Sequence, residues 1–117
     1  MKLKEIASIL NGKVLSCPEK VEDLEIERVG AADMMSDVLA FAQPGMLLIT
    51  GLNTTQVVRT ASIVGISAVV IVRKKMVPEE TIQAANLFGL PVIHSPLTMY
   101  TACGKLYEQS IKDLYAI

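Results

Sequence analysis

Three short apolar runs, each separated from the next by one amphipathic segment, constrain the fold of this sequence most strongly. The runs span residues 46–50, 68–72 and 91–93. Gly65 and Gly89 end the two segments between them, as glycine commonly does at the carboxyl end of a helix. Strands that alternate with helices pair in parallel through right-handed crossovers. The pattern therefore predicts an α/β fold with a mainly parallel central sheet, in two or three layers.

Apolar residues at helical spacing mark four helices. They are Leu3, Ile6, Ile9 and Leu10 before Asn11-Gly12; Val57, Val58, Ala61 and Val64; Ile82 and Ala85; and Met99, Ala102, Cys103, Leu106 and Tyr107. Pro78 is expected at the first position of the third helix. Ser95-Pro96 is interpreted as the start of the fourth, which is expected to run towards Asp113.

Shorter patterns complete the chain. Val14-Leu15 predicts a brief strand, and residues 24–27 alternate apolar with acidic side chains as a half-exposed strand does. The intervening residues 17–23 are interpreted as a loop. Ser36-Asp37 is expected to cap a helical turn, because either side chain can accept a hydrogen bond from the first backbone amides.

The composition indicates one domain over residues 1–117 and excludes two classes of partner. Its 51% of hydrophobic but only 4% of aromatic residues favours a core of aliphatic side chains, as in a parallel sheet buried on both faces. A net charge of −1 supplies no field for nucleic acid. Apolar runs far shorter than a membrane span and the lack of a leader pattern make us expect a cytoplasmic protein.

Neither a metal site nor a cofactor is predicted. Cys17 and Cys103 lie far apart and form no metal-binding motif with His94, the only histidine. Asp33 and Asp37 could hold a divalent cation, but two such carboxylates more often cap and solvate a helix start. The six methionines lack a repeated ligand spacing, so we interpret them as core filling and contact surface.

Polar segments follow all three apolar runs. Because the carboxyl ends of parallel strands meet at one edge, they are expected to converge there and to bind a small anion or nucleotide. The predicted ligand-binding residues are Thr50, Gly51, Asn53, Thr54, Thr55, Arg73, Lys74, His94 and Ser95. The alternative is purely structural: Thr54 or Thr55 caps the following helix, and residues 73–75 form a solvated loop.

No catalytic site is predicted. His94 has a suitable side chain for acid–base chemistry, but the sequence around it offers no partner carboxylate or nucleophile. The common phosphate-loop, dinucleotide and nucleophile-elbow motifs do not occur. An enzyme with His94 as acid or base and residues 50–55 holding a phosphate is the third and last hypothesis, after the two below.

Four strings together span most of the chain: residues 33–40, 65–71, 89–93 and 98–107. Together they resemble the DRTGG domain, a small α/β module. The resemblance implies a fold similar to the N-terminal domain of HPr kinase. It also implies a regulatory role, since such domains occur beside CBS domains in some pyrophosphatases, within phosphotransacetylases, and alone. The pentapeptide Asp-Arg-Thr-Gly-Gly is absent, and residues 72–75 stand where a glycine-containing loop is expected.

Two functions follow as hypotheses. The first is a non-catalytic, ligand-sensing regulatory domain that forms a homodimer, because a mean hydropathy of +0.44 indicates apolar surface buried between subunits. The alternative is a structural or interaction protein that docks on a separately encoded metabolic enzyme.

Overall fold

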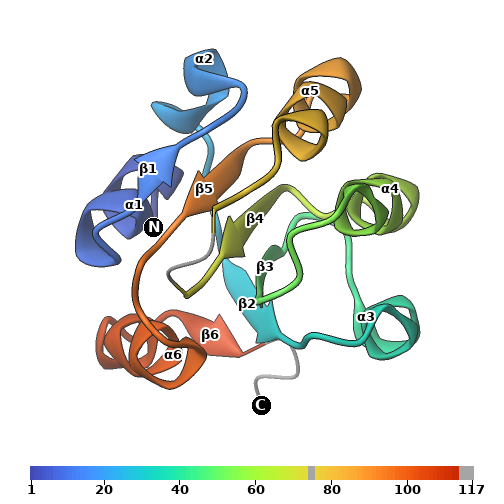
Figure 1. Cartoon of the computed structure of the whole chain (residues 1–117). Helices are drawn as coiled ribbons and strands as arrows, with labels where there is room; N and C mark the ends of the chain where they lie inside the picture. Colours follow the sequence, from blue (N-terminus) through green and yellow to red (C-terminus); the bar gives the residue numbers. More distant parts are fainter. Residues whose placement is uncertain (74–75, 114–117) are drawn as a thin grey trace.

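Helices and strands alternate along the chain, as the apolar runs predict (Figure 1). The computed structural model describes residues 1–73 and 76–113. The helices are α1 (Leu3–Ile9), α2 (Pro18–Val21), α3 (Met35–Phe41), α4 (Thr55–Val64), α5 (Glu79–Phe88) and α6 (Met99–Glu108). The strands are β1 (Lys13–Val14), β2 (Arg28–Ala31), β3 (Leu47–Thr50), β4 (Ala68–Ile71), β5 (Val92–His94) and β6 (Lys112–Asp113).

The strands form one sheet in the order β1-β5-β4-β3-β2-β6. All neighbouring pairs are parallel except β1 and β5. The predicted α/β class with a mainly parallel sheet is therefore confirmed. Residues on the two central strands point alternately to opposite faces, and every residue of β3 and β4 is buried. This explains why these strands are continuous apolar runs in the sequence.

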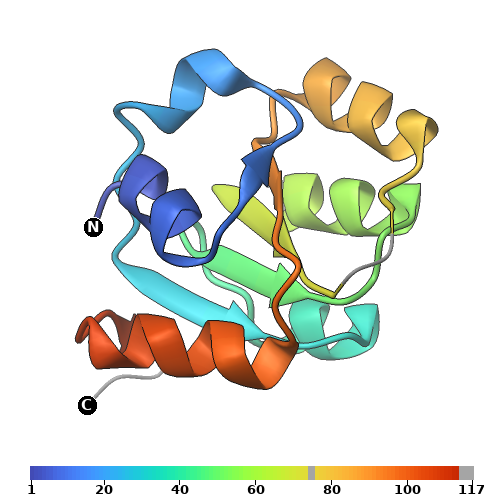
Figure 2. The same ribbon diagram turned by 60° about the vertical axis from the view of Figure 1, so that its left-hand side comes forward.

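Helices cover both faces of the sheet, so the fold has three layers (Figures 1 and 2). One core lies between the sheet and α3, α4 and α5, and it contains Leu48, Val69 and Ile71. The second lies between the sheet and α1 and α6, and it contains Ile49 and Val70. Because the helix that follows β4 and the helix that follows β5 lie on opposite faces, the two strand exits flank a topological switch point.

The predicted helix ends at Gly65 and Gly89 are confirmed. Gly65 has φ 77° and Gly89 has φ 69°, the left-handed backbone that side-chain-bearing residues adopt only with strain. Their amides donate to the carbonyls of Ala61 and of Ala85 and Asn86. These sharp endings turn the chain directly into β4 and β5.

The strand predicted at residues 24–27 is wrong. Ile26 is buried between exposed acidic neighbours, as the alternation predicts. Its amide, however, donates to the Met1 carbonyl at 2.8 Å, and Glu25 forms only an isolated bridge with Lys2. The segment therefore pairs with the chain start, and the sheet strand follows it as β2.

The prediction that Ser36 or Asp37 caps a helix is also wrong. The helix α3 begins at Met35, so both residues lie inside its first turn, and its N-cap residue Met34 makes no side-chain cap bond. The carboxylate of the preceding Asp33, which could have reached these amides, is instead bonded to Gly51.

One short helix and one strand were missed, and the bounds of α5 and α6 differ from the predicted ones. The short helix α2 lies within the predicted loop 17–23, with Pro18 at its start. Pro78 is the N-cap of α5 rather than its first residue. The last helix begins at Met99, after the capping Thr98, and ends at Glu108. Residues 112–113 then form β6, whose two exposed charged residues carry no strand pattern.

Candidate functional site

The exits of β3, β4 and β5 meet at one edge of the sheet. The ladder pairs Thr50 with Ile71, and Ile71 with His94, so the residues that follow these strands lie side by side. We call this edge, with Thr50, Gly51, Arg73, His94 and Ser95, the carboxyl rim. The predicted convergence of these segments is present in the fold.

Asp33, which the sequence pattern did not place at this edge, organises the carboxyl rim. Its Oδ1 accepts a hydrogen bond from the Gly51 amide at 2.7 Å, and its Oδ2 accepts one from Arg73 Nη2 at 3.1 Å. The Thr50 hydroxyl lies at a longer 3.4 Å from Oδ1. A backbone amide, a hydroxyl and a guanidinium thus converge on one carboxylate, the arrangement that anion sites use.

Gly51 permits the close approach of Arg73. A Cβ atom at position 51 would lie 2.8 Å from both Cζ and Nη1 of that side chain. The guanidinium therefore lies directly over the Gly51 backbone, where the amide also points to Asp33. The group that approaches Gly51 in the structure is thus a side chain of the same chain.

The backbone of Arg73 is held in an uncommon conformation. Its φ is 80°, in the left-handed region, where a side-chain-bearing residue costs about 1–3 kcal/mol. Two hydrogen bonds stabilise it: the Arg73 amide donates to the Leu97 carbonyl at 2.8 Å, and His94 Nε2 lies 2.7 Å from the Arg73 carbonyl. Because a carbonyl only accepts, Nε2 carries the proton. His94 thus orients the arginine, and the bonds bridge the exits of β4 and β5.

Ser95 and Thr50 are fully buried and serve the interior of the fold. The Ser95 hydroxyl donates to the Leu10 carbonyl at 2.6 Å and accepts from the Leu97 amide at 3.2 Å. The Thr50 hydroxyl accepts from the Leu52 amide at 3.1 Å. Both hydroxyls therefore fix the loops of the carboxyl rim from below rather than face solvent.

The remaining predicted ligand-binding residues are Asn53, Thr54, Thr55 and Lys74. Asn53 links loops, because its Nδ2 donates to the Met76 carbonyl and its own carbonyl accepts from Thr81. Thr55 accepts from Arg59 one turn later, and the exposed Thr54 is the N-cap of α4 without a side-chain cap bond. The cap proposed as the alternative role of these threonines is therefore absent as a side-chain bond. Lys74 lies outside the described residues.

The ion pair of Arg73 and Asp33 is half exposed, with side-chain exposures of 51% and 45%. Solvent screens such pairs, and exposed ion pairs stabilise proteins by only about 0–1 kcal/mol. The ion pair between these two side chains can therefore open at little cost.

The rest of the described chain offers little reactive chemistry. Burial raises the pKa of the Cys17 thiol and of the Cys103 thiol, so both stay protonated near neutral pH. Across residues 1–73 and 76–113, no group of three or more His, Cys, Asp or Glu side chains is arranged to hold a metal ion. In the same residues, no helix combines the length and the apolar character needed to cross a bilayer.

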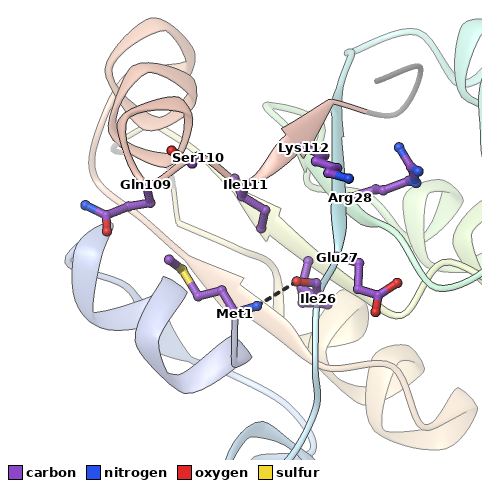
Figure 3. A pocket seen from close by; sticks show the side chains of 8 residues that line it. All are labelled: Met1, Ile26, Glu27, Arg28, Gln109, Ser110, Ile111 and Lys112. Carbon is purple, nitrogen blue, oxygen red and sulfur yellow. Dashed lines mark hydrogen bonds between the residues drawn. The ribbon is translucent and has the colours of Figure 1, made fainter. Parts of the chain in front are cut away.

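A polar pocket of about 400 Å³ lies at the opposite edge, where β2 and β6 begin (Figure 3). Arg28 and Lys112 are neighbours across the ladder between these strands, and Glu27 also lines the pocket. Arg28 Nη1 donates to the Asp113 carbonyl at 3.1 Å, and the Met1 amine donates to the Ile26 carbonyl at 3.0 Å. This pocket is lined by cations, a carboxylate and apolar groups. They do not converge on one point, as the donors of the carboxyl rim converge on Asp33.

Asp33 was missed for a structural reason. It follows β2, so it reaches the same edge as the residues that follow β3 and β4. With the strand placed at residues 24–27, the sequence pattern did not assign Asp33 to a strand exit. Its position two residues after a correctly placed strand would have been the signal.

Comparisons with known proteins agree on the architecture. The family model of the DRTGG domain matches residues 5–108. A crystal structure of the CBS and DRTGG domains of the regulatory region of Clostridium perfringens pyrophosphatase, complexed with the activator diadenosine tetraphosphate, is similar with a TM-score of 0.74 and 22% identity. The match covers 99% of this chain and 50% of that chain, so the chain spans about half of its length. No curated protein sequence matches the chain.

Proposed function

The chain belongs to the DRTGG domain family, and from this premise we propose that it is a non-catalytic regulatory domain that binds a small anion at the carboxyl rim. The ligand class is a phosphate or carboxylate group, alone or as part of a nucleotide. The residues that bind it are Gly51, through its amide, and Arg73, through its guanidinium. His94 and Ser95 position them.

One observation carries this proposal: a carboxylate already lies between the two donors. Asp33 accepts from the Gly51 amide at 2.7 Å and from Arg73 at 3.1 Å. The oxygens of an external phosphate or carboxylate are anionic acceptors that the same two donors can bind. Asp33 then competes with the ligand, and ligand binding replaces the Asp33 carboxylate with the anionic group of the ligand.

The comparison with the pyrophosphatase regulatory region is the reason to include nucleotides among the probes. The similar pyrophosphatase regulatory region is complexed with diadenosine tetraphosphate, although that complex also contains CBS domains, and 22% identity supports likeness of fold alone. The rim residues of this chain provide contacts to a phosphate group, and no base-binding pocket is part of the proposal. A phosphate-centred ligand is therefore the form of the hypothesis to test first.

Thermal unfolding of the full chain tests the proposal with inorganic phosphate, ATP and diadenosine tetraphosphate as probes. At a concentration about ten times Kd, a bound probe is expected to raise Tm by roughly 5 °C. Arg73→Gln is expected to abolish this rise, whereas Arg59→Gln, which removes the same charge from an exposed position of α4, should preserve it. Asp33→Ala frees both donors and should tighten binding several-fold.

The outcomes against the proposal are definite. If no probe at millimolar concentration raises Tm for either the unmodified chain or Asp33→Ala, the anion site is refuted. A rise that persists in Arg73→Gln would place the ligand elsewhere.

We further propose that the chain acts as a homodimer. Its mean hydropathy of +0.44 and its exposed apolar side chains support burial of surface between copies. Docking on a separately encoded metabolic enzyme is the second candidate, and the same exposed surface supports it. Sedimentation of the chain alone separates them, since only the homodimer forms without another protein.

A further inference from the structure

The outward face of α6 leaves two aromatic side chains exposed. Tyr100 and Tyr107 retain 89% and 78% of their accessible surface, two helical turns apart. Gly104 lies between them, and no atom lies within 4 Å of the place where its Cβ would be. Figure 2 shows α6, in orange-red, at the lower edge of the molecule. The helix thus presents a ridge, a gap and a ridge.

Gly104 is not explained by packing within the described chain. A glycine in the middle of an exposed helix lowers stability by about 1 kcal/mol relative to alanine. A Cβ atom at this position would meet open space. Close approach of a second helix does explain it, because small residues let helix backbones come near one another. A shallow groove runs along this face and is lined by Tyr100, Cys103, Gly104 and Tyr107.

The pattern of this face is symmetric about its middle. Tyr100 and Tyr107 stand at equal distances from the midpoint between Cys103 and Gly104. A twofold axis through that point, perpendicular to the helix, places Tyr100 of one copy beside Tyr107 of the other, twice. A twofold interface requires such a self-complementary patch. We propose that α6 is the homodimer interface, with the helices of two copies packed antiparallel and crossing at Gly104.

The charge of this face agrees with a second copy as the occupant, and its tyrosines supply more than half of the area that a stable interface needs. The face carries one cation and one anion, Lys105 and Glu108, so two identical faces do not repel. An exposed tyrosine can bury about 150–250 Å², so the four tyrosines of a pair offer roughly 700 Å² of the about 1,200 Å² at the low end of stable interfaces. Met99 and the stems of the two charged side chains border the same groove.

Sedimentation velocity of the full chain, without ligand and over a range of concentrations, tests the proposal. The unmodified chain is expected at twice the monomer mass of 12.7 kDa. Gly104→Glu brings two like charges together at the axis, so it should weaken dimerisation by at least about 30-fold, the loss typical of a hot spot. Glutamate is a better helix former than glycine, so the monomer should not lose stability. Gln83→Glu, on the exposed side of α5, is the control of equal charge.

A second variant probes the geometry directly. In a chain that also carries Cys17→Ala and Cys103→Ser, Gly104→Cys places one thiol at the crossing point of each copy. Mild oxidation is expected to yield a disulfide-linked dimer, and the same substitution at the exposed Gln83 is expected to yield none.

This interface rests on the proposed homodimer, and the outcomes separate the two. A dimer that persists unchanged in Gly104→Glu refutes the α6 interface and leaves the homodimer to another surface, such as that of Ile63, Leu87 and Phe88. A monomer at all concentrations refutes both. Neither outcome affects anion binding at the carboxyl rim, which is measured separately.

Discussion

The carboxyl rim and the outward face of α6 meet their chemical requirements in opposite ways. At the rim, each polar group described above finds a partner inside the chain: Asp33 lies on Gly51 and Arg73, and the Ser95 hydroxyl makes two bonds. The face of α6 instead leaves Tyr100 and Tyr107 largely exposed. A polar site can satisfy itself until a ligand competes, whereas an apolar surface is satisfied only by covering it. The two regions therefore call for different partners.

The largest expected effect tests how firmly the rim is tied to the interior. Ser95→Ala leaves the buried Leu10 carbonyl and the Leu97 amide without their shared partner, which should lower the free energy of unfolding by about 2–3 kcal/mol. Ser8→Ala, at an exposed position of α1, should change it by less than about 0.5 kcal/mol. Urea denaturation measures both. A loss for Ser95→Ala as small as the control's would mean that solvent replaces these bonds.

The next effect concerns the start of α6, where the carboxyl rim and the outward face of α6 adjoin along the chain. Thr98 is the N-cap of this helix, and its hydroxyl accepts from the Thr101 amide at 3.3 Å. Thr98→Ala should lower the free energy of unfolding by about 1 kcal/mol, because it removes the hydroxyl that accepts from the Thr101 amide. Thr98→Ser keeps the acceptor and should restore most of the loss. Equal losses in the two variants would assign the effect to the methyl group.

The fold was predictable where burial is complete and the pattern is therefore simple. Every residue of β3 and β4 is buried, and both strands were found as continuous apolar runs. The strand β6 consists of Lys112 and Asp113, both exposed, and only its pairing with β2 makes it a strand. The pattern of apolar and polar residues within a short segment does not predict such pairing, because the pairing depends on tertiary contact with another strand.

The candidate site was predictable to a similar degree and for the same reason. Gly51 and Arg73 were found because they follow buried strands, and parallel strands bring their exits together. Asp33 was missed because it follows β2, whose half-exposed residues do not resemble a buried strand. The backbone role of His94 was equally hidden, since the hydrogen bond to the Arg73 carbonyl depends on the left-handed turn at that residue.

A smaller effect is expected in the reactivity of the Cys103 thiol on α6. Burial raises the pKa of Cys103, so its thiol should react with iodoacetamide several-fold more slowly than a free cysteine at pH 8. The raised pKa of Cys103 also makes the free energy of unfolding depend on pH. Its contribution to stability is fully present below the ordinary thiol pKa of 9.0, and it is lost as the pH rises through the pKa of the folded state. Cys17, whose pKa burial also raises, acts in the same direction.

Mass spectrometry of the alkylated chain, with Cys17→Ala to isolate Cys103, measures this rate. If α6 is the dimer interface, Gly104→Glu should speed alkylation, because Cys103 borders the same groove. An equal rate in both forms would separate Cys103 from any surface that dimerisation covers.

The smallest expected change in stability is the sharpest test of the rim. Gly51→Ala places a Cβ 2.8 Å from the Arg73 guanidinium, which is the free end of a flexible, half-exposed side chain and can move away. The free energy of unfolding should therefore change by less than about 0.5 kcal/mol. The anion-dependent rise in Tm should nevertheless fall, because the guanidinium can no longer lie over the Gly51 amide. Gly104→Ala is the matched control: its Cβ meets no atom, so the rise should persist. An undiminished rise in Gly51→Ala would show that the amide and the guanidinium do not act on one ligand.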